Sequence, residues 1–132
     1  MSNQEKVQAI YNYVRSHITY SGNHNGSASN WRPAALQGLS SRKGDCVVFM
    51  ASMKALLDYQ GIDNKIVERH TSSNHYWNLV NCGDGWYHYD TVKRSGPKCY
   101  KWTDATIDAY SANTKNGYYD FDHSKYPATP EQ

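Results

Sequence analysis

The sequence contains no apolar run close to the roughly 18 residues that a membrane-spanning helix needs. Its first residues, MSNQEKVQAI, also lack the apolar core of a signal peptide. Neither sign of charge dominates, because 14 Lys and Arg residues stand against 12 Asp and Glu residues, a formal net charge of +2. Such a balance provides no strong field for nucleic acid or for a membrane surface. We therefore expect a chain that neither inserts into a membrane nor binds nucleic acid.

The chain is also too short for two domains. Its 132 residues suffice for one domain with a modest core, so we expect residues 1–132 to form a single domain. A start directly on an amphipathic segment also fits a domain cut from a longer protein. Phenylalanine is scarce, with 2 residues, but 12 Tyr and 4 Trp are present. These aromatic residues suit half-buried strands or a cleft lined with rings, and the strand interpretation is favoured.

Two segments have the spacing of amphipathic helices. Ser2 and Glu5 have the spacing of a capping box, and the apolar residues that follow predict a helix ending near His17: Val7, Ile10, Tyr11, Val14 and Ile18. A second helix is predicted from Cys46, and Gly61 supplies the left-handed residue that commonly ends a helix.

The segment between these helices is rich in turn-forming residues. Residues 21–30, SGNHNGSASN, predict a surface loop. Pro33 then predicts a short helical turn that runs through Gln37 and is ended by Gly38.

The cysteine in RKGDCVVFMASMK lies at the predicted start of the second helix. Asp45 is a favourable N-cap residue, which puts Cys46 at the first helical position. Free N–H groups and the positive end of the helix dipole stabilise a thiolate there. The alternative is that Cys46 is one more small apolar side chain on the buried face of the helix, since free cysteines are commonly buried.

Three strands are predicted after the second helix, over residues 62–69, 75–80 and 86–90. The stretch NCGDG between the last two is a strong hairpin signal, because it separates two aromatic-rich runs. A loop centred between Cys82 and Gly83 places His75 directly opposite Asp90. Directly opposed residues share a face, with Cβ atoms about 5 Å apart. The spacing therefore predicts a His75–Asp90 pair.

A thiol at a helix start, a histidine on a strand and an acid on the next strand make a nucleophile, base and orienter set. Three motifs carry this set: Gly44-Asp45-Cys46, His75-Tyr76-Trp77 and the run WYHYDT that contains Asp90. With these motifs the chain resembles the transglutaminase-like superfamily. The segments YNYVRSHITY and FDHSKYP are also similar to parts of that family, so the resemblance covers nearly the whole chain. It implies an α+β, papain-like fold of transglutaminase-core type, with the cysteine helix packed on an antiparallel sheet that carries the histidine and the aspartate.

The resemblance also implies a role for each motif residue. Cys46 is the nucleophile, His75 is the general base and then the acid, and Asp90 fixes the histidine tautomer. The main-chain N–H of Cys46 is one donor to the oxyanion. Tyr20 is the candidate for the second donor, because it occupies the position where some relatives carry an aromatic donor. The other interpretation of Tyr20 is a packed core residue.

The implied activity is acyl transfer from an amide through an acyl-thioester on Cys46. Water as acceptor makes the protein a cysteine peptidase or amidase, and an amine makes it a transglutaminase. Compact members of bacterial type are more often regarded as proteases or as proteins of unknown activity, and we favour hydrolysis of a protein or peptide substrate. We expect no cofactor and no metal, and take a monomer as the default. Family habit and the Tyr, Asn and Ser content favour an extracellular or cell-surface location.

Two other functions fit the same residues. A transglutaminase-like domain can survive as a silent binding or scaffold module, although the presence of Cys46, His75 and Asp90 together favours an enzyme. His75, His88 and Asp90 with the thiol could instead hold Zn²⁺, but no tight Cys/His ligand spacing accompanies them. His88 is more simply a supporting or packing residue.

The remaining histidines and cysteines carry weaker signals. The histidines without an evident partner are interpreted as surface or structural residues: His17, His24, His70 and His123. Cys82 and Cys99 could pair in an oxidising compartment, but two independent thiols are favoured.

Overall fold

The computed structural model describes residues 1–70, 74–114 and 117–131. In chain order the elements are α1 (Asn3–His17), β1 (Thr19–Tyr20), α2 (Arg32–Ser40), β2 (Lys43–Gly44), α3 (Cys46–Tyr59), β3 (Asp63–Glu68), β4 (Tyr76–Asn81), β5 (Trp86–Asp90), β6 (Cys99–Trp102), α4 (Asp104–Ala112) and a 3₁₀ turn, η1 (His123–Lys125). Strands β3 to β6 form an antiparallel sheet in sequence order, and β1 pairs with β2 in parallel. No helix of the described residues is long and apolar enough to cross a bilayer.

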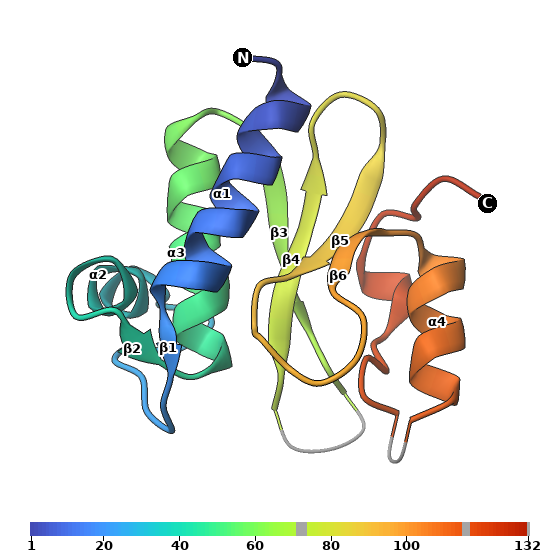
Figure 1. Cartoon of the computed structure of the whole chain (residues 1–132). Helices are drawn as coiled ribbons and strands as arrows, with labels where there is room; N and C mark the ends of the chain where they lie inside the picture. Colours follow the sequence, from blue (N-terminus) through green and yellow to red (C-terminus); the bar gives the residue numbers. More distant parts are fainter. Residues whose placement is uncertain (71–73, 115–116, 132) are drawn as a thin grey trace.

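The sheet is covered on both faces. Helices α1, α2 and α3 gather on one side, and α4 with the C-terminal segment lies on the other (Figure 1). Strand β4 therefore lacks the alternation of a half-exposed strand: Tyr76 and Val80 join the core on the α3 side, whereas Trp77 and Leu79 join the core on the α4 side. Each side of the sheet thus has a hydrophobic cluster of its own.

The two predicted amphipathic helices are confirmed. Helix α1 begins with the predicted capping box, in which Glu5 N–H donates to Ser2 Oγ (3.1 Å) and Ser2 N–H donates to Glu5 Oε1 (2.8 Å). Helix α3 begins at Cys46 behind its N-cap, Asp45, and Gly61 follows its end with a φ of +70°. Both caps were recognisable because they depend on neighbours within a few residues.

The predicted end of the short helix at Gly38 is wrong. Helix α2 runs on to Ser40, and Gly38 lies inside it against α3. A Cβ atom at this position would clash with Ser52 Oγ and lie 2.9 Å from Val48 Cγ1. Glycine therefore serves here for the close approach of two helices, which a sequence cannot distinguish from a helix end.

The predicted hairpin register is also wrong, by two residues. Strand β4 pairs Leu79 with His88 and Asn81 with Trp86, so the loop consists of residues 82–85. Asn81 stays in the strand and its Oδ1 accepts from the N–H groups of Gly83 (2.8 Å) and Gly85 (3.3 Å). His75 is therefore not directly opposite Asp90. A shift of two residues leaves both side chains on the same face, however, because side chains alternate with a period of two.

The elements after β5 have weaker sequence signals and were not predicted. Strand β6 pairs with β5 across a register shift between His88 and Asp90. Helix α4 has nine residues, and only Ile107 and Ser111 are buried on it. Such a short apolar stripe gives little helical periodicity.

Candidate active site

Cys46 opens helix α3 at the junction of the helical layer with the sheet. Asp45 Oδ1 accepts from Val47 N–H (3.0 Å), which fixes the first turn of the helix and leaves the Cys46 N–H outside this cap. The side chain is buried but not sealed, with 8% of its surface exposed. The thiol thus lies at the positive end of a helix, where an anion is stabilised.

His75 and Asp90 form the predicted pair. His75 lies directly before β4, Asp90 is the last residue of β5, and the His75 Nε2–H donates to Asp90 Oδ2 at 2.8 Å. They are 6% and 2% exposed, respectively. The pair is diagonal rather than directly opposed, a separation that a ring on one strand can still bridge.

The pKa of His75 depends on both of the other predicted site residues, Cys46 and Asp90. Burial by itself would lower the pKa of His75, but the charge and hydrogen bond of Asp90, followed by the hydrogen bond and charge of Cys46, raise this pKa to about 9. Because Nε2 is bonded to Asp90, Nδ1 is the ring nitrogen left for the thiol. The structure therefore brings Cys46, His75 and Asp90 together, with the imidazole between the thiol and the carboxylate.

Two residues that the sequence did not single out complete the surroundings of Asp90. Tyr119 O–H donates to Asp90 Oδ2 (2.7 Å), and Arg94 Nε donates to Tyr119 Oη (2.9 Å). Val92 N–H donates to Asp90 Oδ1 (3.1 Å). Despite complete burial, which raises the pKa of a carboxyl group, the charge and hydrogen bond of His75 and the bonds from Tyr119 and Val92 lower the pKa of Asp90. No local pattern distinguishes Tyr119 among 12 tyrosines.

Tyr20 is not a packed core residue, because 55% of its surface is exposed. Its ring stacks on Phe49, one turn into α3, with the centroids 6.1 Å apart. Partial burial, and then the charges of Cys46 and Asp45, raise the pKa of its hydroxyl. The phenol is therefore within electrostatic reach of the thiol, and β1 holds it there by pairing with β2, the strand that precedes Cys46.

His88 is committed to other partners. Its Nδ1 accepts from Trp77 Nε1–H (3.0 Å) and its Nε2–H donates to Asp104 Oδ1 (2.7 Å). Both ring nitrogens thus serve to attach β5 to β4 and α4, as expected of a supporting residue. Among residues 1–70, 74–114 and 117–131, no group of three or more His, Cys, Asp or Glu side chains could hold a metal ion.

The other histidines are exposed, as predicted, although three of them have acidic partners that the sequence did not reveal. His24 contacts Asp45 (2.7 Å), and the two remaining pairs are His70–Asp120 (3.6 Å) and His123–Asp108 (3.0 Å). Cys82 and Cys99 are free thiols, which confirms the favoured interpretation. Burial raises the pKa of Cys82 and raises that of Cys99 more strongly.

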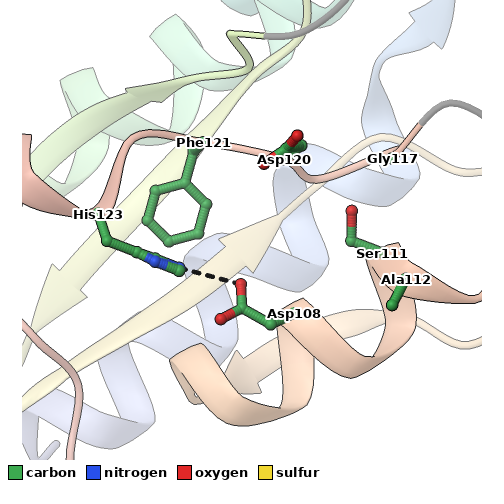
Figure 2. Close-up of a pocket in the computed structure, with 7 residues that line it drawn as sticks. All are labelled: Asp108, Ser111, Ala112, Gly117, Asp120, Phe121 and His123. Carbon is green, nitrogen blue, oxygen red and sulfur yellow. Dashed lines mark hydrogen bonds and ion pairs between the residues drawn. The ribbon is translucent and has the colours of Figure 1, made fainter.

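Two pockets lie at different distances along the chain from the predicted site residues: one borders Tyr76, and the other lies over α4. A cavity of about 410 Å³ opens beside Tyr76, the neighbour of His75, between the loop at residues 27–29 and the side chains of Ile66, Glu68 and Tyr126. The pocket of about 440 Å³ drawn in Figure 2 lies over α4 and the C-terminal segment, and the His123–Asp108 pair spans it. None of Cys46, His75, Asp90 and Tyr20 lines either pocket. The first includes Tyr76, the residue after His75, and the pKa of its hydroxyl is raised by burial, by Glu68 and by the charge of Cys46.

Comparisons with known proteins agree on the fold. The family model of the transglutaminase-like superfamily matches residues 1–91. A "putative cysteine protease" from Cytophaga hutchinsonii is 19% identical, with a TM-score of 0.56 over 67% of this chain and 31% of that one. A structure described as a TGase is 17% identical, with a TM-score of 0.57 over 96% of this chain and 36% of that one. No curated protein matches the sequence.

These matches identify a domain of mixed helix and antiparallel sheet with the papain-like fold. The chain belongs to the transglutaminase-like superfamily, because the family model matches well over half of it. The predicted α+β architecture is confirmed, with the Cys46 helix packed on the sheet that carries Asp90. The chain spans about a third of the length of both solved structures.

Proposed function

We propose that this domain is a thiol enzyme that transfers an acyl group from an amide, with Cys46 as nucleophile, His75 as acid and base, and Asp90 as the residue that orients His75. One observation carries the proposal: the buried His75–Asp90 hydrogen bond of 2.8 Å, on an imidazole that also interacts with the thiol at a helix start. This chemistry requires a nucleophile that is hydrogen-bonded to a base, and a third residue that is hydrogen-bonded to the base and orients it.

The protons can be followed through both half-reactions. With a pKa of about 9, His75 holds a proton at neutral pH and can stand as imidazolium beside a Cys46 thiolate. The thiolate attacks the amide carbonyl, a C–S bond forms, and His75 gives its proton to the departing amine as the C–N bond breaks. The neutral imidazole then takes a proton from water, which attacks the thioester and restores the thiolate and the imidazolium.

Two groups are the proposed donors to the oxyanion that forms in these steps. The Cys46 N–H belongs to the free donors of the α3 N-terminus, because Asp45 caps Val47 instead. Tyr20 is the proposed second donor, since the charge of Cys46, after partial burial, contributes to the raised pKa of its hydroxyl. Half of the ring is exposed, so the phenol can reach a bound substrate without rearrangement of the core.

A protein or peptide is the proposed substrate, and water is the favoured acceptor. The cavity beside Tyr76 lies between the loop at residues 27–29 and residues of β3, β4 and the C-terminal segment, and we propose that an extended chain binds there. Water needs no acceptor site of its own, whereas an amine needs a second one. The comparison structures include a protein described as a protease and one described as a TGase, so both acceptors belong in the test.

A thiol-directed probe tests the nucleophile without knowledge of the substrate. Wild type, Cys46→Ala, His75→Ala and the control Cys82→Ala would be treated with iodoacetamide near neutral pH, with intact mass and peptide mapping as read-out. We expect Cys46 to react first, Cys46→Ala and His75→Ala to lose the fast phase, and Cys82→Ala to keep it. Equal labelling of the three cysteines would contradict the proposal.

Acceptor choice is tested with a peptide library and a glutamine-donor peptide, each with and without a primary amine. Hydrolysis predicts cleaved or deamidated products that the amine does not suppress; transfer predicts amine-linked products. In the alternative, a silent binding module, no acyl-thioester forms on Cys46, and Cys46→Ala binds peptide as wild type does.

A further inference from the structure

Asp90 is held on the side away from His75 by a chain of buried hydrogen bonds. Its Oδ2 accepts from both His75 Nε2–H (2.8 Å) and Tyr119 O–H (2.7 Å), and its Oδ1 accepts from Val92 N–H (3.1 Å). Three donors on two oxygens leave the carboxylate no freedom to rotate. Tyr119 has 0% of its surface exposed, so water does not replace its hydroxyl.

The direction of this chain is fixed by Arg94. A guanidinium N–H can only donate, so the bond from Arg94 Nε to Tyr119 Oη (2.9 Å) leaves the phenol hydrogen for Asp90. Arg94 itself is held by three rings, with its guanidinium carbon 4.7 Å from the centroid of Tyr110, 5.2 Å from Tyr118 and 5.0 Å from Tyr119. The cation polarises the O–H that points at Asp90, which strengthens both bonds.

We propose that Tyr119, polarised by Arg94, is a positioning residue for the active site, which holds the Asp90 carboxylate in the plane that aims His75 at Cys46. The proposal rests on the proposed function of the triad. Tyr119 bonds the Asp90 carboxylate, its ring lies 5.9 Å from that of His75, and it is not among the residues that line the cavity beside Tyr76. The bond to Asp90 is the route by which we expect it to act on the active site. It lies 29 residues beyond Asp90 in the chain, in the segment between α4 and η1.

Other groups near Asp90 contact its main chain or interact with its charge through space. Tyr11 O–H donates to the Asp90 main-chain oxygen (2.9 Å), and Cys99 pairs with Asp90 across β5 and β6. The charge of Asp90 also reaches Tyr118, the half-exposed Tyr20 and Arg94. The side chains of His75 and Tyr119 bond the Asp90 carboxylate directly, and the Val92 N–H is its third donor.

The central variant is Tyr119→Phe, which keeps the ring and removes the hydroxyl. We expect kcat to fall about tenfold with KM unchanged, the effect of losing one hydrogen bond to a charged group. The acid limb of Cys46 alkylation should move to higher pH by about one unit, because Asp90 without this donor is protonated more readily. The matched control is Tyr100→Phe, whose ring packs on Tyr89 (centroids 5.2 Å apart) in the cluster on the α3 side of the sheet, and which should leave the rate and the pH profile unchanged.

A double-mutant cycle separates positioning from packing. In an Asp90→Asn background, Tyr119→Phe should cost almost nothing further, because the carboxylate that it positions is already gone. A tenfold loss that persists in Asp90→Asn, or a wild-type pH profile in Tyr119→Phe, would overturn the proposal. Should Tyr119→Phe not fold, Arg94→Met leaves the phenol in place and is expected to shift the same acid limb in the same direction by a smaller amount; an unchanged limb would contradict the proposal.

Failure of the proposed function looks different. If Cys46→Ala and Asp90→Asn retained wild-type turnover and labelling, the triad itself would be wrong. If both lost activity while Tyr119→Phe and Arg94→Met behaved as wild type, the triad would stand and only the positioning proposal would fall.

Discussion

The two sides of the sheet differ in composition and in what they supply to the candidate active site. The cluster on the α1–α3 side is built mainly from aliphatic residues and methionine, whereas the cluster on the α4 side contains Trp77, Tyr119 and Phe121, with Trp102 and Tyr110 packed against it. The first side contributes the thiol through a helix start. The second contributes the hydroxyl that holds Asp90.

The first side depends on contacts between residues close in sequence, and the second depends on contacts between residues far apart in sequence. The position of Cys46 follows from a cap one residue away and from the apolar stripe of its own helix. The support of Asp90 comes from side chains that meet only after the chain has crossed the sheet and returned past α4 (Figure 1). His75 joins the two, since it interacts with Cys46 on one side and Asp90 on the other.

The largest expected effect comes from the carboxylate that the aromatic side holds. Asp90→Asn should lower turnover by a factor of about 10⁴, the loss seen for the corresponding change in a serine triad, because the amide favours the wrong tautomer and cannot stabilise imidazolium. The Asn oxygen can still accept from Val92 N–H, so the fold should persist, with a melting temperature lowered by the loss of the carboxylate charge that stabilises protonated His75. Turnover and a melting curve check this, with Asp84→Asn at the hairpin tip as control. Unfolding of Asp90→Asn would make Asp90 a structural residue.

The sequence predicts the helices of the first side and the proximity of Cys46, His75 and Asp90, while the roles of these three residues stay a prediction. The capping box of Ser2, the cap of Asp45 and the left-handed Gly61 were predictable because each depends on a few neighbours. The His75–Asp90 contact was predicted from a hairpin register that is wrong by two residues, and it survived only because such a shift preserves the face.

The aromatic side was beyond sequence reasoning for physical reasons. Tyr119 and Arg94 bond across 25 residues, and nothing in the spacing of either indicates the other. Gly38 was interpreted as a helix end because a glycine that permits close packing and one that ends a helix look alike in a sequence. Tyrosine-rich segments without periodicity give no indication of which hydroxyl meets which carboxylate.

The ionisation of His75 depends on residues from both sides of the sheet, so the pH dependence of stability measures their contact. The pKa of His75 rises from 6.5 to about 9 on folding, so its contribution is complete below pH 6.5 and is lost as the pH rises through 9. A pKa difference of one corresponds to about 1.4 kcal/mol, so about 3 kcal/mol of unfolding free energy should disappear over this range. Denaturant unfolding at a series of pH values measures it.

The control for this pH dependence is His75→Gln, which should remove most of the fall between pH 6.5 and 9. At the acid end the sign is opposite: the lowered pKa of Asp90 gives stability that is present above its ordinary value of 3.8 and is lost as the pH falls below it. A wild-type stability that does not change between pH 6.5 and 9 would show that the imidazole is not charged in the folded protein.

The packing of α2 on α3 can be disturbed without changing the cluster on the α4 side. Gly38→Ala forces a Cβ against Ser52 and Val48, so α2 must move away from α3, at a cost of about 2 kcal/mol. Gly22→Ala is the matched control, since a Cβ there meets nothing within 4 Å. Chemical denaturation compares the two variants. A cost for Gly38→Ala no greater than for Gly22→Ala would mean that the helices yield freely.

The smallest expected effect comes from Asp45, the N-cap residue of α3, which precedes Cys46. Asp45→Ala removes the acceptor of Val47 N–H (3.0 Å) and also the partner of His24 (2.7 Å), and loss of an N-cap typically costs about 1 kcal/mol. Asp45→Asn keeps a cap oxygen and should retain most of that stability, although it loses the charge that attracts His24. The rate of Cys46 alkylation should fall with the cap in Asp45→Ala, because a frayed first turn no longer presents its N–H groups to the thiolate. If Asp45→Ala melts and labels as wild type does, the start of α3 is held by the packing of the helical side alone, and the local construction argued for this side is incomplete.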